Sequence, residues 1–464
     1  MKSFLSHNYK MLLIALIGAV LAFFWQEINL HTLNAIQSEN LQTIPTADDA
    51  SYLAPPLNFL ENGEWADNSE GISRYFQRPP GYGFIYLISY LTLGENAVIG
   101  LKFIQWLSYL LSIILFYKIL EHFQISTKKT IVFTSIFALL PIYSGFMYYT
   151  LTEGISPFLL LVSMYAFFKK KSTLLLVCTI LLLLVRPQLI IFPLLCLIFS
   201  IIQKEKRQIT ILLIAFLPLI FWNLRTTFIA KEWMGIHPIY SDKNISLFRP
   251  GHEALTKLFK IWEYDGERFH TIIGSTCSAQ NQDEIELLNT HIPKQFQTDV
   301  FPLLLQFNQL YQREDYGKSE DFLQTEREFV QTVNHTYSKL LRKNLTTNYI
   351  VTPFLSAKYL LTKSQLNLYI FQKTFRGSWW MEILRICCVA LINLGFIACL
   401  FILFQPIKIE WKLIALACLI YLFYLSFFQR MNEERYLVPL LPILLLMVSM
   451  IRVKSVRFTF IKNL

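Results

Sequence analysis

Charged residues are scarce in this chain: they make up 16% of the 464 residues, whereas hydrophobic residues make up 54%. The apolar residues come in long blocks, not in the short periodic patterns typical of soluble domains. This distribution excludes a soluble globular protein as the overall class. Ten-residue segments of alternating polarity, the signature of a membrane β-barrel, do not occur.

The cysteines give no sign of a disulfide framework or of a zinc site. Of the seven cysteines, only Cys277 lies outside the apolar blocks, so no disulfide framework can be built on an outer face. There is no CxxC motif and no Cys/His cluster with zinc spacing. The sequence also lacks an internal repeat and the paired Gly/Pro-broken segments that many transporters show.

The long apolar blocks predict an all-α polytopic membrane protein, because an apolar helix of about 17 to 25 residues crosses a bilayer with its backbone polar groups satisfied. Lys2 and Lys10 precede the first apolar block, as in a signal peptide, but no small-residue cleavage site follows the block. We therefore expect an uncleaved helix. We predict about ten transmembrane helices, at Met11–Gln26, Ala97–Leu120, Ile131–Tyr149, Ile155–Phe168, Leu174–Val185, Leu189–Ile202, Ile209–Phe221, Trp380–Phe404, Leu413–Phe427 and Leu437–Ile451.

The distribution of basic residues predicts the orientation of these helices. With the N-terminus inside, the predicted cytoplasmic segments carry seventeen lysines and arginines but only three glutamates, as the positive-inside rule requires. The net charge of +10 therefore reflects topology and contact with anionic membrane lipids, not a nucleic-acid partner. We expect a multi-pass membrane protein; the resemblance described below implies the bacterial inner membrane.

Two outer segments interrupt the membrane pattern and divide the chain into three parts. Residues 1–224 form an N-terminal transmembrane module whose first outer loop is 27–96. Residues 225–376 are long enough for a small mixed extracytoplasmic domain, and 377–464 supply the C-terminal helices. Within the middle part, apolar residues at helical spacing predict an amphipathic helix over Asp321–Lys343. Both a position on the membrane and a position over an outer cavity remain open for it.

The ionisable residues near the predicted helix ends fall on one side of the membrane. Because a charge at the bilayer centre costs at least about 2.5 to 3.5 kcal/mol, such residues occupy an interface or a water-filled cavity. Taken one at a time, each of these residues could also be an ordinary charge at the membrane interface. Asp48, taken by itself, could also be a helix N-cap. The residues are Asp48, Asp49, Arg78, Glu153, Arg186, Arg225, Arg430, Glu433, Glu434 and Arg435.

Their motifs favour a common function. Asp48-Asp49-x-x-Tyr52, followed by Arg78-Pro79-Pro80-Gly81-Tyr82, resembles the first outer loop of the GT-C superfamily of membrane glycosyltransferases with lipid-phosphate sugar donors. This superfamily includes the protein O-mannosyltransferases and the lipid A aminoarabinose transferase. Further similar motifs follow in order: Thr152-Glu153, Arg186-Pro187, Trp222-Asn223-x-Arg225, and Glu434-Arg435-Tyr436 with Pro439 and Pro442. The segment 225–376 resembles nothing we can name.

The resemblance implies a transfer from a polyprenyl-phosphate sugar to an acceptor hydroxyl at the extracytoplasmic face, with inversion at the anomeric carbon. A carboxylate then receives or orients the hydroxyl proton, for which Asp48 is our first candidate and Asp49 the second. Guanidinium groups suit the departing phosphate because they bind its oxygens bidentately. Arg78 is expected in that role, helped by Arg186 and Arg435. The remaining pocket candidates are Tyr52, Tyr82, Glu153, Arg225 and Glu434.

Three alternatives remain open. Asp48, Asp49 and Glu153 could together hold a divalent cation, although no cofactor is required. The same arginines would also suit an oligosaccharyltransferase or glycan ligase acting on lipid-diphosphate donors. A transporter or flippase for a lipid-linked sugar would bind phosphate without breaking a bond. The sequence leaves the acceptor open between glycan, lipid and protein.

Overall fold

The computed structural model describes residues 2–32, 48–67, 78–230, 250–315, 319–363, 378–430 and 432–451. In these ranges the chain is helical and contains no β-strand. The elements of the membrane part are α1 (Lys2–Thr32), α4 (Ala97–His122), α5 (Thr127–Leu139), α6 (Pro141–Ser144), α7 (Ser156–Phe168), α8 (Ser172–Val185), α9 (Ile191–Ile202), α10 (Lys206–Ala230), α17 (Trp379–Phe404), α18 (Ile409–Tyr424) and α19 (Leu441–Met450).

Apolar helices long enough to cross a membrane confirm the membrane class. In the described ranges there are six such segments: Asn8–Trp25, Gly81–His122, Thr127–Met147, Lys206–Ile229, Trp379–Phe404 and Ile409–Gln429. Three shorter apolar stretches, at Ser156–Phe168, Ser172–Val185 and Pro187–Ile202, coincide with other predicted spans. Large apolar side chains on α17, such as Ile386, Phe401 and Phe404, are exposed. An apolar surface of this kind is stable against lipid but costly in water.

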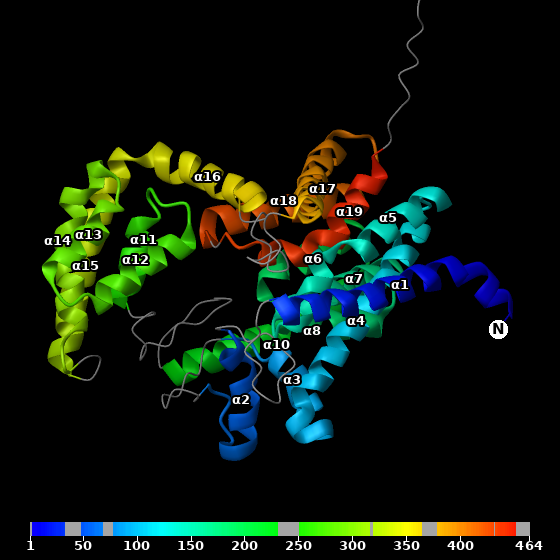
Figure 1. The fold of residues 1–464 in the computed structure, drawn as a ribbon, viewed down its shortest axis with the longest axis horizontal. Helices are drawn as coiled ribbons and strands as arrows, with labels where there is room; N and C mark the ends of the chain where they lie inside the picture. The colour runs from blue at the N-terminus through cyan, green and yellow to red at the C-terminus, as the bar shows by residue number, and fades with distance from the viewer. Residues whose placement is uncertain are drawn as a thin grey trace, which may run out of the picture.

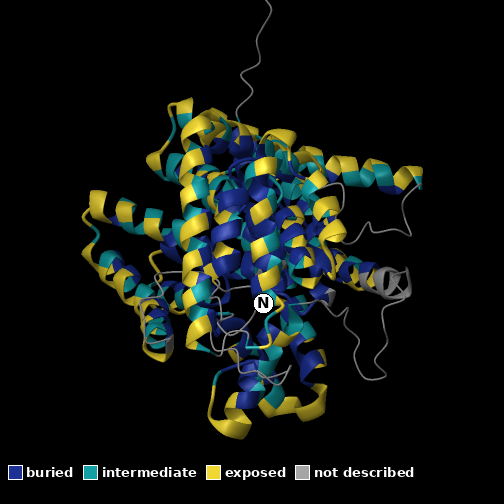
Figure 2. Ribbon diagram, turned by 90° about the vertical axis from the view of Figure 1, so that its left-hand side faces the viewer, coloured by how far each residue is buried: buried dark blue, intermediate teal, exposed yellow. Residues whose placement is uncertain are grey.

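A continuous apolar core joins the first and last parts of the chain. It includes Tyr109 and Phe137 of the N-terminal helices and Tyr421 and Leu444 of the C-terminal ones, all almost fully buried. Figure 2 shows this buried column surrounded by helices with exposed outer faces. Because α19 packs against α5 and α7 as well as against α17, residues near the C-terminus lie close to the N-terminal module.

The first outer loop contains more helix than its sequence indicates. Asp49–Asn62 forms α2, and Gly81–Leu93 forms α3, which leads through a short 3-10 turn, η1 (Gly94–Asn96), into α4. The sequence-based boundary left Gly81–Leu93 in the loop, whereas the structure joins it to α4 in one apolar helical segment, Gly81–His122. In the structure α3 packs against α4 and α8.

The middle part of the chain folds around a second apolar core. Its elements are α11 (Pro250–Phe259), α12 (Gly266–Ser278), α13 (Gln282–Thr290), α14 (Lys294–Tyr311), α15 (Glu320–Lys343), the π-helical turn η6 (Thr347–Val351), α16 (Thr352–Lys358) and η7 (Tyr359–Lys363). Figure 1 shows α11 to α15 beside the membrane helices, with α16 running back toward α18. We call residues 250–363 the outer domain, after the side of the membrane that the sequence predicts for them.

The predicted amphipathic helix over Asp321–Lys343 is confirmed as α15, but its partner was not foreseen. Its apolar residues, including Phe322, Phe329 and Val333, are buried in the core of the outer domain. They pack against α11 and α14. The apolar face of α15 therefore neither lies on the membrane nor covers a cavity.

Gly81 fixes how closely α3 approaches α8, and substituting it tests the fold. A Cβ at Gly81 would lie 2.5 Å from the carbonyl carbon of Leu184 and 2.6 Å from the nitrogen of Val185. Both are backbone atoms that cannot rotate away. We expect Gly81→Ala to destabilise the protein by about 1 to 3 kcal/mol, measured as a lower apparent Tm in detergent. Gly274→Ala is the control, since no atom lies within 4 Å of its added Cβ; equal Tm values for the two variants would contradict this packing.

Candidate functional site

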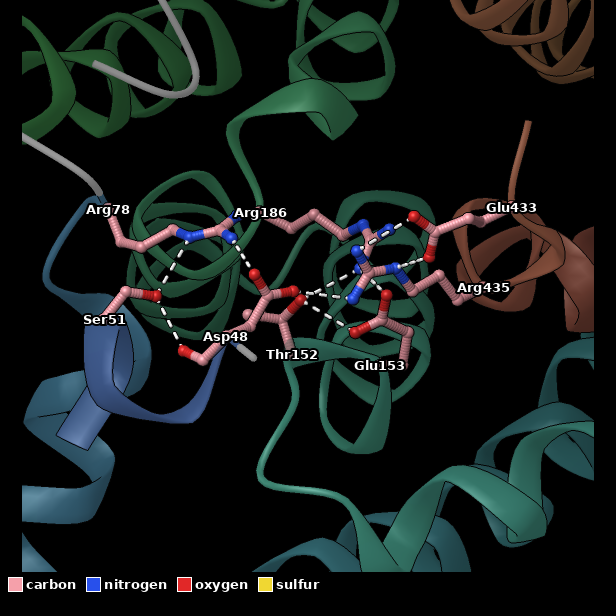
Figure 3. Close-up of polar contacts among 8 residues, drawn as sticks. All are labelled: Asp48, Ser51, Arg78, Thr152, Glu153, Arg186, Glu433 and Arg435. Atoms are coloured by element: carbon pink, nitrogen blue, oxygen red, sulfur yellow. Dashed lines mark hydrogen bonds and ion pairs between the residues drawn. The ribbon is translucent and has the colours of Figure 1, made fainter. Parts of the chain in front are cut away.

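Four distant chain segments meet at one polar cavity. Its lining residues are Asp48, Tyr52, Arg78, Pro79, Thr152, Glu153, Val185, Arg186, Pro187, Gln188, Arg435 and Tyr436. The empty space in and in front of the cavity, which includes open solvent, is about 380 Å³. Figure 3 shows Asp48 and Arg78 approaching from the first loop, Glu153 from the turn before α7, Arg186 from the end of α8, and Arg435 from the turn before α19. Six predicted site residues are thus brought together.

Asp48 is the central anion of this cavity. Arg78 Nη2 donates to its Oδ1 at 2.5 Å, and Arg435 Nη1 donates to its Oδ2 at 2.7 Å. Burial would raise the pKa of Asp48, but the charges of Arg78 and Arg435 outweigh it and hold the pKa below its usual value. Asp48 stands at the N-cap of α2, yet its side chain makes no capping hydrogen bond. The carboxylate therefore binds the arginines instead of capping the helix.

Arg186 forms the deepest ion pair of the site. Its Nη1 lies 2.8 Å from Glu153 Oε1 and donates to Thr152 Oγ1 at 2.9 Å. The side chains of Arg186 and Glu153 are only 4% and 3% exposed. Two further donors of Arg186, Nε and Nη2, are buried and make no hydrogen bond of ordinary geometry among the described residues, although the Tyr421 hydroxyl lies near the guanidinium. A buried donor without an acceptor is costly, so this guanidinium has hydrogen-bonding capacity left for a ligand.

Aromatic rings hold the guanidinium groups in place. Arg78 lies over the ring of Tyr52, with 5.0 Å from its Cζ to the ring centroid. Tyr436 has two such neighbours, Arg186 at 5.3 Å and Arg435 at 5.4 Å. Cation–π contacts of this kind orient arginines without consuming their hydrogen-bond donors.

The charge balance of the site favours anions. Arg435 is also ion-paired with Glu433, whose pKa is raised to about 7, chiefly by burial and in part by other carboxylates including Glu267 and Glu153. The raised pKa keeps Glu433 protonated to a higher pH than an ordinary glutamate. The cavity itself is lined by three arginines, Arg78, Arg186 and Arg435, but by only two acidic residues, Asp48 and Glu153, so basic side chains outnumber acidic ones.

Four predicted site residues do not line the cavity. Asp49 begins α2 and is not among the lining residues, since adjacent helical residues point in different directions. Tyr82 lies behind Tyr52, fully buried, and donates to Gln105 Oε1 at 2.8 Å. Arg225 donates to the carbonyl of Trp65 at 2.8 Å and so attaches α10 to the first loop. Glu434 is buried at the start of η12 (Glu434–Leu440).

Gln105, a residue that the motifs did not indicate, lies behind the cavity and holds two of its elements together. Gln105 of α4 accepts the hydrogen bond of Tyr82, and its Nε2 donates to the carbonyls of Met147 and Tyr149 at 3.1 and 3.2 Å. It thereby fixes the turn that leads to Thr152 and Glu153. The available signal was a single amide within an apolar span, because a polar group there needs buried partners.

The proposed cation ligands do not form a metal site. Across the described ranges, no three His, Cys, Asp or Glu side chains are grouped as a metal ion requires. The oxygens of Asp48 and Glu153 face arginines instead. Their arrangement fits guanidinium partners and does not fit a divalent cation.

Comparison with known proteins does not assign the chain to a family. No family model, no curated protein and no solved structure matches it.

Glu434 offers a test of the electrostatics around the cavity. Burial raises the pKa of Glu434 to about 8, so the folded protein holds a proton that the unfolded chain releases near pH 4.5. Unfolding then releases this proton, and stability falls as pH rises between these two values. In Glu434→Gln we expect a smaller decrease of the apparent Tm between pH 5 and pH 8 than in the unchanged protein. The same decrease in both proteins would show that Glu434 has an ordinary pKa.

Proposed function

We propose that the protein is a glycosyltransferase of the GT-C type, which moves a sugar from a polyprenyl-phosphate donor to an acceptor hydroxyl at the extracytoplasmic face of a bacterial inner membrane. The observation that carries this proposal is the convergence of Arg78, Arg186 and Arg435 on one cavity that also holds Asp48. These are the residues of the motifs whose order resembles that superfamily. About ten membrane spans and an extracytoplasmic position of the outer domain belong to the proposal.

Donor binding follows from the arginines. A phosphate monoester or diester is recognised by guanidinium groups through paired, charge-assisted hydrogen bonds. The Nε and Nη2 of Arg186 and the excess of basic over acidic side chains supply such contacts. A phosphate would also compete with Asp48 for Arg78 and Arg435, and its arrival would free the carboxylate. The exposed apolar helices keep the isoprenoid tail of a donor in the membrane while its head group reaches the cavity.

The transfer itself needs few groups. The bond between the anomeric carbon and the phosphate oxygen breaks, and its electron pair stays on the polyprenyl phosphate, where the arginines stabilise the charge. The acceptor oxygen bonds to the anomeric carbon from the opposite face, and its proton passes to the Asp48 carboxylate. Arg78 and Arg435, which hold the pKa of Asp48 low, bind the phosphate at this stage, so the freed carboxylate is a better base than before the donor binds. It takes the proton as the new bond makes the hydroxyl acidic.

Replacing Asp48 tests this chemistry. We expect Asp48→Asn to lower transfer by about 10²-fold to 10⁴-fold, because the amide cannot accept the proton, while binding of the donor lipid stays measurable. Turnover is measured with membrane lipid extracts as donor source. Asp49→Asn is the control, since Asp49 does not line the cavity. Normal turnover in Asp48→Asn would refute its role.

Replacing Arg435 tests donor binding separately. We expect Arg435→Gln to weaken binding of farnesyl phosphate by about tenfold or more but to leave binding of farnesol unchanged, because only the phosphate contacts guanidinium groups. Native mass spectrometry of the purified protein measures both. Arg268→Gln removes an arginine that is 48% exposed in the outer domain and serves as control. If both lipids are weakened equally, Arg435 does not bind phosphate.

A deletion strain separates the enzyme from a transporter. Loss of a transferase leaves its polyprenyl-phosphate sugar unused, so we expect that lipid to accumulate in the membrane lipid extract. Mass spectrometry of the extract also identifies the sugar. Unchanged lipids together with lost export of a solute would favour transport.

A further inference from the structure

Arg430 lies just before the segment that carries Glu433 and Arg435, but it does not line the cavity. It ends the π-helical turn η11 (Leu425–Gln429) with φ 54° and ψ 24°, a left-handed conformation that residues other than glycine rarely adopt. Its side chain is only 2% exposed. Backbone of this kind persists where surrounding contacts determine it, and it occurs preferentially at functional sites.

The guanidinium of Arg430 donates to three backbone carbonyls of the outer domain. Its Nη1 donates to the carbonyls of Lys260 and Glu263, the second at 3.2 Å, and its Nη2 donates to the carbonyl of Asn348 at 3.1 Å. Lys260 is the first residue after α11, and Glu263 lies in the turn that follows it. A guanidinium from the membrane part thus binds backbone carbonyls at the end of α11 and in the next turn of the outer domain.

Neighbouring residues reinforce this attachment. Asn432 Nδ2 donates to the carbonyl of Tyr264 at 2.5 Å, and Asn432 Oδ1 accepts from Ser356 Oγ at 2.8 Å. Lys260 Nζ donates to the carbonyl of Phe428 at 2.9 Å. Phe428, Arg430 and Asn432 are therefore attached to four places in the outer domain: the end of α11, the turn after it, η6 and α16.

We propose that Arg430 is a positioning residue: it binds the outer domain to the segment of Arg435, so that this domain sets where Arg435 meets Asp48. The role in donor binding rests on the proposed function. The positioning of Arg435 does not rest on the proposed function, because Arg430 and Arg435 lie close together in the sequence and Arg435 is paired with Asp48. The outer domain then controls the site without contributing a lining residue.

Hydrogen exchange of the full chain in lipid nanodiscs tests the positioning. In Arg430→Gln we expect exchange of the amides in residues 432–440 to rise by about tenfold or more, because three buried carbonyls lose their charged donor. Exchange in α7 and α17 should stay unchanged. Arg327→Gln, on the exposed face of α15 (59% exposed), is the matched control and should change neither region. Unchanged exchange in residues 432–440, or a rise throughout the chain, would overturn the proposal.

A second variant tests the proposal even if Arg430→Gln does not fold. Asn432→Ala removes only the two hydrogen bonds to Tyr264 and Ser356, so we expect a smaller local rise in the same amides. If Arg430→Gln does not fold, this variant decides: a local rise supports the proposal, and no rise overturns it.

Farnesyl phosphate binding measures the consequence for the cavity. We expect Arg430→Gln to weaken it nearly as much as Arg435→Gln, and the double variant to be little weaker than either single one, since both act through Arg435. Fully additive losses would overturn the positioning role. If the unchanged protein does not bind farnesyl phosphate, the proposed function fails, while the exchange experiment still decides whether Arg430 positions the segment.

Discussion

The arrangement of this site depends on the carboxylate of Asp48, which bridges two guanidinium groups. Asp48 holds Arg78 at 2.5 Å and Arg435 at 2.7 Å, although Arg435 is 387 positions away in the chain. The pairing requires the first outer loop and the turn before α19 to meet, which the packing of α19 against α5 and α7 makes possible. Because both oxygens of Asp48 are committed, the position of one charge determines the positions of the other two.

Charge, burial and aromatic stacking act together in the cavity. Buried ion pairs contribute little net stability, since desolvation offsets much of their attraction. The arginines here are nevertheless oriented by the rings of Tyr52 and Tyr436. Such an arrangement is understandable if the charges serve a ligand more than the fold. The unused donors of Arg186 are consistent with that interpretation.

Much of the site could be predicted from short motifs, because charged residues at the ends of membrane helices are kept out of the apolar core of the bilayer and gather where those helices end. The motif order placed Asp48, Arg78, Glu153, Arg186 and Arg435 in one pocket, and they do line one cavity. What the sequence could not decide is which of two adjacent acids faces inward. Glu433 and not Glu434 pairs with Arg435, because local backbone turns set those directions. The outer domain was equally hard to foresee, since its apolar face has several possible partners until the helices pack.

An experimental map of the protein in nanodiscs with farnesyl phosphate is the most direct test of the central claim. We expect phosphate density in the cavity, within hydrogen-bond distance of Arg435 and of the Nε or Nη2 of Arg186. We also expect Asp48 to be displaced from at least one arginine. Phosphate density elsewhere, or Asp48 and Arg78 on opposite faces of the membrane, would contradict this claim.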